Sequence, residues 1–117
     1  MTRAPVPGDD PYLPAPQTVY WVDTTVLPAG DPDAQRPVVV VAVPPTSSGT
    51  VTVVARSATD GFGVPHPADR RLGLSAPGHF SRRHPVQGQL WTAGNVTEVG
   101  SLDDATFAAV LSRFLAR

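Results

Sequence analysis

Arginine and hydroxyl side chains gather at the two ends of one valine-rich stretch. Arg36 lies just before a valine run at 38–43, and Arg56, Ser57 and Thr59 lie just after a second run at 50–55. A guanidinium fork beside a hydroxyl can hold a phosphate and stabilise negative charge that develops on it. The pattern therefore suggests phosphate chemistry. The alternative is that Arg36 is a solvated residue closing a loop.

The two β-branched runs, 38–43 and 50–55, are predicted to be buried strands, because valine packs well on a pleated surface and short apolar runs bounded by turn residues favour strands. The segment between them, 44–49, carries two prolines and a glycine and predicts a hairpin turn. In an antiparallel pair the start of one strand lies beside the end of the next. Arg36 and the segment 56–59 should then meet at one rim of the sheet.

The remaining pattern predicts more strands, two long loops and a final helix. Strands are expected at 18–23 and, from weaker signals, at 78–82, 85–91 and 96–99, with loops at 24–35 and 60–78. A capping box at 101–104, with Ser101 as N-cap, should start the helix. Its apolar stripe consists of Phe107, Val110, Leu111 and Phe114. This order predicts a mainly β fold, a small bent barrel or half-barrel closed by a C-terminal helix.

Length and composition favour a single globular domain. The chain has 117 residues, 41% of them hydrophobic and 16% charged. Residues 1–16, rich in proline, are expected to form a flexible tail, and 17–117 the barrel domain. The absence of cysteine, signal peptide and long apolar run favours a cytoplasmic protein without membrane contact.

The charge pattern argues against a general nucleic-acid binder but leaves phosphate recognition open. The formal net charge is −1, whereas basic nucleic-acid-binding domains usually have a high pI. All nine basic residues are arginine, and four of them form the pairs Arg70–Arg71 and Arg82–Arg83. Coding bias is the favoured interpretation of this composition; the functional interpretation is that guanidinium forks suit phosphate, and the two are compatible.

Other chemistries find less support. His66, His79 and His84 lack helical metal-ligand spacing, so surface histidines are favoured over a metal site. The glycines at 61–63 lack the strand–turn–helix context of a phosphate loop, and no nucleophile elbow supports a Ser-His-Asp triad. Trp21 and Trp91 are interpreted as core or interface residues rather than a base-stacking platform.

Four segments of the chain carry a family resemblance. They are V-Y-W-V-D at 19–23, R-P-V-V-V-V at 36–41, G-T-V-T-V-V-A-R-S at 49–57 and G-S-L-D-D at 100–104. These segments resemble the MazF/PemK toxins. The likeness covers residues 18–115. It implies the SH3-like plasmid-maintenance barrel shared with CcdB, usually a homodimer, that cleaves single-stranded RNA without a metal or other cofactor. It also implies a cognate antitoxin as protein partner in a type II toxin–antitoxin system.

The resemblance also assigns roles. It implies that Arg36 stabilises the phosphorane and assists proton transfer, while Ser57 hydrogen-bonds a non-bridging oxygen and a 2′,3′-cyclic phosphate forms. An arginine is a poor general base, so we favour the electrostatic role. Thr59, on the same strand face as Ser57, remains the alternative hydroxyl. Predicted substrate-binding residues are Arg56, Asp60, Arg82, Arg83 and Gln87.

The chain also departs from the family pattern. Ala42 stands where the family prefers serine, and 56–59 differs from the usual Pro-x-Thr-Ser. The segment 79–83 replaces the family motif x-S-x-V-x-x-D-Q, to which only Val86-Gln87 remains similar. The alternative function is therefore a catalytically degenerate barrel that binds a protein or nucleic acid. A gyrase poison of the CcdB type is disfavoured because the C-terminal segment 114–117 contains no tryptophan.

Overall fold

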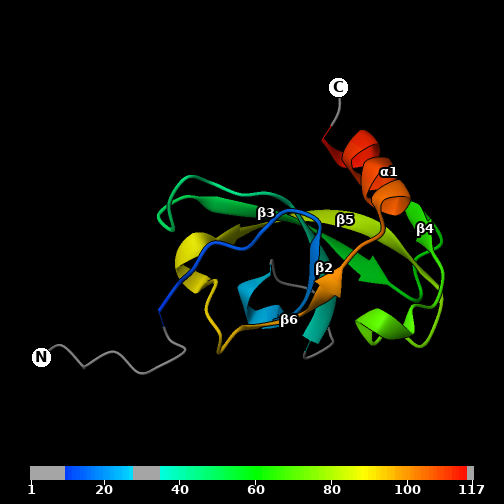
Figure 1. The fold of residues 1–117 in the computed structure, drawn as a ribbon, viewed down its shortest axis with the longest axis horizontal. Coiled ribbons are helices and arrows are strands. Elements are labelled where there is room, and N and C mark those ends of the chain that lie inside the picture. The colour runs from blue at the N-terminus through cyan, green and yellow to red at the C-terminus, as the bar shows by residue number, and fades with distance from the viewer. Residues whose placement is uncertain (1–9, 28–34, 116–117) are drawn as a thin grey trace, which may run out of the picture.

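The computed structural model describes residues 10–27 and 35–115, and the statements below concern these residues. The elements in chain order are strand β1 (Thr18–Asp23), 3-10 helix η1 (Thr24–Val26), strands β2 (Gln35–Ala42), β3 (Thr50–Ser57) and β4 (Val64–His66), 3-10 helix η2 (Arg70–Leu72), strand β5 (Gly78–Gln87), 3-10 helix η3 (Gly88–Leu90), strand β6 (Val96–Ser101) and helix α1 (Asp104–Phe114). Figure 1 shows α1 beside β4 and β5 at one side of the sheet.

The strands form one antiparallel six-stranded sheet in the order β4-β5-β3-β2-β1-β6. Register shifts interrupt the ladder in three of its strand pairs, β1–β6, β2–β3 and β3–β5, and such shifts increase the local bend and twist. The sheet curls into a half-barrel that carries a C-terminal helix. The predicted fold class is thus confirmed.

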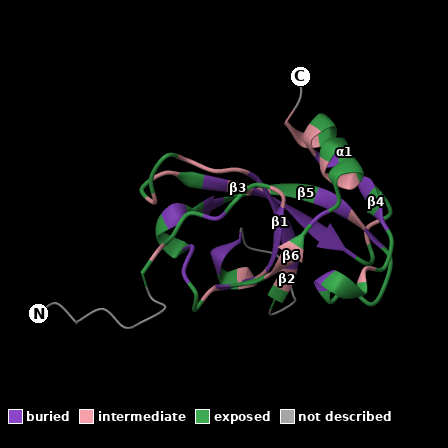
Figure 2. Cartoon of the chain, in the orientation of Figure 1, coloured by how far each residue is buried: buried purple, intermediate pink, exposed green. Residues whose placement is uncertain are grey.

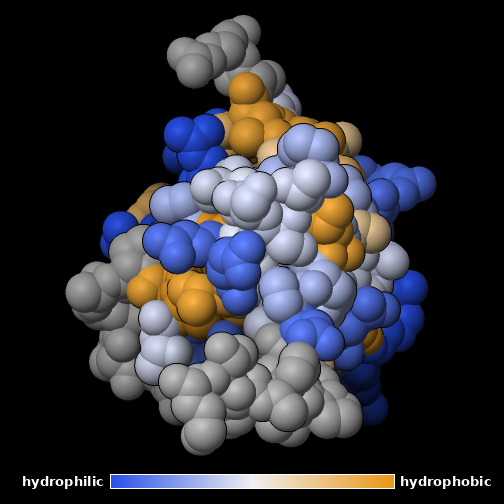
Figure 3. Space-filling model, turned by 90° about the vertical axis from the view of Figure 1, so that its left-hand side faces the viewer, coloured by the Kyte–Doolittle hydropathy of each residue, from blue (hydrophilic) through white to orange (hydrophobic). Residues whose placement is uncertain are grey.

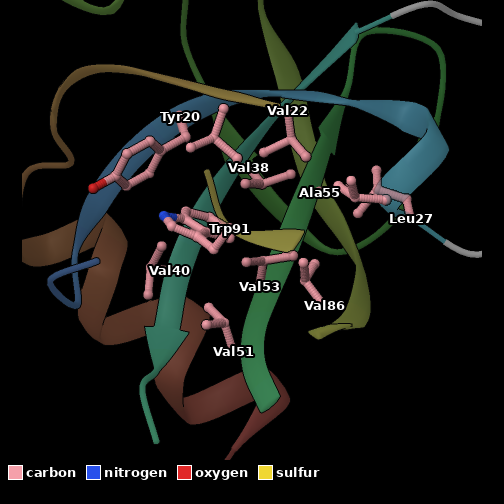
Figure 4. Close-up of a cluster of buried hydrophobic side chains, with 12 residues drawn as sticks. Tyr20, Val22, Leu27, Val38, Val40, Val51, Val53, Ala55, Val86 and Trp91 are labelled. Carbon is pink, nitrogen blue, oxygen red and sulfur yellow. The ribbon is translucent and has the colours of Figure 1, made fainter. Parts of the chain in front are cut away.

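The concave interior is filled by valines and two aromatic rings. Val22, Val38, Val40, Val51, Val53 and Val86 pack with Tyr20, Leu27, Ala55 and Trp91 (Figure 4). The rings of Tyr20 and Trp91 meet edge to face, with centroids 4.9 Å apart. Burying each valine contributes about 1.5–3 kcal/mol, so this cluster contributes a large part of the stability. Trp91 is completely buried, as the core interpretation predicted.

A second cluster covers the outer face of the sheet beneath α1. Val19, Val39 and Val54 lie on the strand faces opposite to the first cluster and pack with Phe80 and, from the helix, Val110. Phe107, Leu111 and Phe114 pack against this cluster, which confirms the predicted helical stripe. Trp21 is partly buried against it as well. Both faces of the central strands are therefore buried, as Figure 2 shows.

The predicted start of the helix was wrong by two residues. Ser101 belongs to β6 and pairs with Thr18, so it is unavailable as a cap. Asp103 is the N-cap instead, and its carboxylate accepts a hydrogen bond from the Thr106 amide at 2.9 Å. This bond helps to hold the pKa of Asp103 below its usual value. Sheet pairing outcompeted the local capping box because Ser101 could satisfy its backbone groups in the ladder.

Strand β5 is one continuous element where two shorter strands were predicted. Pro85, the first residue of the second predicted strand, pairs with Thr52 on one side only, since β4 reaches only Gly78 to Phe80 on the other. A proline is tolerated on a strand edge that lacks a partner. Trp91 lies beyond this strand, after η3. The predicted loop 60–78 also contains β4 and η2.

Two predicted loop or tail segments are only partly described. In the loop 24–35, residues 24–26 form η1, and 28–34 lie outside the described residues. In the tail, residues 1–9 also lie outside them, while the Tyr12 amide donates to the Trp91 carbonyl at 3.0 Å. Tyr12, Leu13 and Leu90 are each more than one-third exposed. Figure 3 shows that hydrophobic areas on the face toward the N-terminal end are separate rather than continuous.

Helix α1 has 11 residues, and no helix in the described ranges is long and apolar enough to span a membrane.

Candidate functional site

Arg36 and Ser57 lie at the same end of the β2–β3 pair. The last ladder partners at that end are Val38 and Ala55, and Arg36 and Ser57 are each two residues further along their strands. Because alternate residues share a face, both belong to the face that carries Val38 and Ala55. The structure therefore brings the two strand ends to one rim.

The Ser57 hydroxyl organises the turn that follows β3. Its Oγ accepts hydrogen bonds from the amides of Thr59 and Asp60, both at 3.1 Å, and lies 3.1 Å from Thr59 Oγ1. With both lone pairs of Ser57 Oγ engaged, its hydroxyl hydrogen is the group left to donate. Ser57 is only 8% exposed, whereas Thr59 is exposed. Thr59 thus has the hydroxyl that a ligand can reach, and the buried Ser57 hydroxyl orients it by hydrogen bonding to Thr59 Oγ1.

Asp60 connects this turn to β5. Its Oδ2 accepts a hydrogen bond from Ser81 Oγ at 2.8 Å and lies 3.5 Å from Arg82 Nε. The Arg82 side chain is 62% exposed, and its guanidinium carbon lies 5.3 Å from the centre of the Phe62 ring. The hydroxyl turn, the carboxylate and one exposed guanidinium therefore form a continuous chain of contacts.

An open pocket of about 690 Å³ lies beside the turn. Thr59, Asp60, His66 and His79 are among the residues that line it. His79 is the ladder partner of Ser57 and so lies next to the hydroxyl pair. The pocket brings an imidazole, a carboxylate and a hydroxyl to one side of the rim, a set of groups that can bind a phosphoester and transfer protons.

Arg56, predicted to bind substrate, is instead part of the interior. It is 4% exposed; its Nε donates to His66 Nδ1 at 2.9 Å, and its Nη2 donates to the carbonyls of Ala76 at 2.7 Å and of His66 and Pro67 at 3.3 Å. Burial lowers the pKa of this guanidinium, while nearby Asp69 opposes the shift. These contacts give Arg56 a structural role in joining β3 to the segment after β4.

His66 is the buried partner of Arg56. Its pKa is lowered, first by burial and then by the positive charge of Arg56, while Asp69 and Asp103 act in the opposite direction. Because Nδ1 accepts from Arg56, the neutral ring carries its hydrogen on Nε2, which faces Asp69 Oδ2 at 3.9 Å. The ring is thus neutral and oriented.

Two further predicted substrate-binding residues lie away from the rim. Arg83 Nη1 donates to the Phe114 carbonyl at 2.8 Å and so satisfies the end of α1 on the outer face. Gln87 pairs with Thr50, at the opposite end of β3 from Ser57. Seven residues of strand separate those ends, about 24 Å. Of the predicted set, the structure gathers Ser57, Thr59, Asp60 and Arg82 in one group, with Arg36 on the same rim.

The sequence reasoning missed three residues of this region, namely Phe62, His79 and Ser81. The Gly-Phe-Gly motif at 61–63 carried a signal, since a large ring between two glycines in a turn is poorly placed to join the core. His79 and Ser81 could be found only from the register of β5 against β3. In the described ranges, no group of three or more His, Asp or Glu side chains is arranged to hold a metal ion.

The likeness to known proteins is a likeness of fold. No protein-family model and no curated protein matches the sequence. Among solved structures, a chain of the MazE–MazF crystal structure from Deinococcus radiodurans (form II) aligns with a TM-score of 0.60 and 13% identity, over 86% of this chain and 90% of that one. Form III of the same complex gives 0.58 and 12%, over 86% and 91%. The half-barrel is therefore MazF-like.

Proposed function

We propose that this chain is a metal-independent endoribonuclease that cleaves single-stranded RNA, and that it is the toxin of a type II toxin–antitoxin system. The observation that carries the proposal is the shared rim of Arg36 with the Ser57–Thr59 hydroxyl pair, on a MazF-like half-barrel. A cation and a hydroxyl donor on one rim suit a phosphodiester whose charge increases during the reaction.

The proposed reaction is an internal transesterification. The ribose 2′-oxygen attacks the adjacent phosphorus, the bond from phosphorus to the 5′-oxygen breaks, and the products are a 2′,3′-cyclic phosphate and a 5′-hydroxyl. Arg36 stabilises the extra charge on the non-bridging oxygens, and Thr59, oriented by Ser57, donates a hydrogen bond to one of them. The proton lost by the 2′-hydroxyl must reach the 5′-oxygen. His79 lines the pocket and is the side chain we assign to this transfer.

The proposed partners are RNA, a second copy of this chain and an antitoxin. The structural neighbours are complexes named MazE–MazF, which supports a protein partner of that kind for this chain. We propose a homodimer whose groove crosses both copies. Sedimentation should give twice the monomer mass at tens of micromolar, roughly the range in which standard-size interfaces hold. A monomer under those conditions would argue against this assembly.

The experiment that tests the activity uses a long RNA with paired and unpaired regions, incubated with purified protein in EDTA. We expect cuts in unpaired regions that leave 2′,3′-cyclic phosphate and 5′-hydroxyl ends. Arg36→Ala should slow cleavage by about 10²–10³-fold, the usual loss when one preorganised charge contact is removed. Arg113→Ala, an exposed arginine in the last turn of α1, is the control and should keep full activity. Full activity of folded Arg36→Ala would rule out the assigned role.

Two single substitutions separate the hydroxyls. The exposure of Thr59 predicts that Thr59→Val lowers kcat by removing the donor to phosphate. Ser57→Ala removes the acceptor of two turn amides and should both lower activity and destabilise the turn. The family register assigns the phosphate contact to Ser57 instead. A loss from Ser57→Ala alone, with Thr59→Val active and both folded, would support that assignment.

The second candidate function is a catalytically inactive barrel that binds a protein or nucleic acid. The burial of Ser57 favours it, since a hydroxyl that holds two turn amides has a sufficient structural role. The RNA assay in EDTA discriminates the two, because an inactive barrel would leave the RNA uncut at any protein concentration.

A further inference from the structure

Phe62 is held outward by the backbone on either side of it. It is 46% exposed and lies between Gly61 and Gly63. Gly63 has a φ of +98°, and a Cβ there would lie 2.2 Å from the Phe80 carbonyl oxygen. Only glycine fits this close approach to β5. The loop is thus fixed against the sheet, and the ring between the glycines faces solvent.

The exposed ring is paired with an oriented cation. The Arg82 guanidinium lies over Phe62 at 5.3 Å from the ring centre, within the range of a cation–π contact. Arg82 Nε also lies 3.5 Å from Asp60 Oδ2, and that carboxylate is held by Ser81 Oγ at 2.8 Å. Phe62, Arg82, Asp60 and Ser81 thus form a row of contacts in which Asp60 positions Arg82 and Ser81 positions Asp60.

The surroundings of the ring decide what kind of ligand suits it. Its chain neighbours Asp60, Gly61 and Gly63 and its contact Arg82 are small or polar, which suits a flat ligand that carries charge beside the ring. Proteins that bind single-stranded nucleic acid combine an aromatic face for a base with positive charge for the backbone. Phe62 and Arg82 supply both. Along the row through Asp60, Arg82 is two contacts and Phe62 three contacts away from the Ser57 hydroxyl.

We propose that Phe62 and Arg82 form a stacking site for one unpaired base of RNA, next to the Thr59 hydroxyl. The assignment of RNA as ligand rests on the proposed function. The base stacks on the exposed part of the Phe62–Arg82 pair, the Arg82 fork contacts the neighbouring phosphate, and Asp60 keeps the guanidinium in place. The site would hold a nucleotide beside the one that is cut and so position the scissile phosphate.

The test measures binding without cleavage. The probe is a fluorescein-labelled pool of random-sequence 2′-O-methyl RNA about ten nucleotides long, which lacks the nucleophilic hydroxyl and is of a length suited to one small domain. Anisotropy at about 0.1 M salt gives Kd, and the salt is held constant because phosphate contacts depend on it. We expect Phe62→Leu to weaken binding about 5- to 100-fold, and Phe62→Tyr to bind within about twofold of the unsubstituted chain.

Tyr12→Leu is the matched control, because Tyr12 is 38% exposed and its amide bonds to Trp91 rather than to the rim. It should not change Kd. Thermal unfolding should show all three variants folded, since Phe62 is 46% and Tyr12 38% exposed and neither belongs to a core cluster.

Three outcomes would overturn the stacking site. They are a Kd of Phe62→Leu equal to that of the unsubstituted chain, equal losses of affinity in Phe62→Leu and Phe62→Tyr, and no binding of the RNA pool by the unsubstituted chain. An unchanged Kd would instead make Phe62 a surface for a protein partner. The outcomes for the two proposals are separable. Cleavage of RNA with a Phe62-independent Kd overturns the stacking site alone, whereas Phe62-dependent binding without cleavage of any RNA supports the site and overturns the nuclease.

Discussion

Replacing Arg56 with alanine should damage the fold rather than a surface site. The side chain is 4% exposed, and its guanidinium donates to His66 Nδ1 and to the carbonyls of His66, Pro67 and Ala76. Truncation removes the donor shared by all four acceptors and leaves a cavity between β3 and the segment after β4. The structural role of Arg56 therefore predicts a loss of stability.

The magnitude follows from how much of this network water can replace. A hydrogen bond to a charged group is worth about 1.5–3 kcal/mol, so four would total about 6–12 kcal/mol if none were replaced. The bonds to Pro67 and Ala76 are only partly buried, so water can satisfy those carbonyls in the variant. The two bonds to His66 are buried and remain unmet. Two unmet bonds of this kind give an expected loss of about 3–6 kcal/mol, from a total of about 5–15 kcal/mol.

The assay is urea denaturation followed by tryptophan fluorescence, since Trp91 is completely buried and Trp21 partly buried in the folded chain. The expected loss corresponds to a fall in Tm of at least about 10 °C for a domain of this size. Arg82→Ala is the control, because that side chain is 62% exposed and should change stability by at most about 0.5 kcal/mol. A loss below about 1 kcal/mol for Arg56→Ala would refute the structural role and return Arg56 to the candidate binding residues.

Three further predictions concern stability. Burial and Arg56 lower the pKa of His66 in the folded state, so the unfolded chain binds more protons just below the ordinary pKa of about 6.5. The free energy of unfolding should therefore be at its full value above that pH and fall by up to about 1.4 kcal/mol per pH unit below it. His66→Asn keeps an acceptor for Arg56 without titrating there, so urea titrations of this variant at several pH values should not show the slope. Asp103→Ala should lower the free energy of unfolding by about 1 kcal/mol through loss of the α1 cap, and an unchanged urea midpoint would contradict the assigned cap. Gly63→Ala should destabilise by more than about 1 kcal/mol because its Cβ would meet the Phe80 carbonyl, whereas Gly61→Ala, with open space around it, is the matched control.

The sheet could be predicted because its signal is local. The valine runs of β2 and β3 are apolar on successive residues, which is the pattern of strands buried on both faces, and both faces are indeed covered. The stripe of α1 was visible for the same reason. The continuity of β5 through Pro85 and the pairing of Ser101 depend on which neighbour each strand has. No local pattern contains that information.

The sequence predicted only the part of the candidate site that follows from the alternation of side chains along regular strands. The shared rim of Arg36 and Ser57 follows from an antiparallel hairpin with regular strands, and both conditions hold at that end. Strand alternation also predicts that Arg56 and Ser57 point to opposite faces of the sheet, because Ser57 shares a face with Ala55 and Arg56 does not. The sequence did not indicate which residue contacts Arg56 on that opposite face. That residue is His66, which belongs to β4, and β4 lies within the segment predicted to be a loop.

The arginine pair on β5 shows why the rest of the site could not be counted from the chain alone. Phe80 packs in the outer cluster, so regular alternation would send Arg82 to the helix side and Arg83 to the rim. The ladder shifts by one residue between Ala55 and Arg56, where Ser81 is the extra residue of β5. This bulge exchanges the two faces, so Arg82 pairs with Ala55 and reaches Asp60, while Arg83 turns to the end of α1. The same Ser81 then donates to Asp60, and its hydroxyl thereby helps to orient the arginine that its insertion brought to the rim.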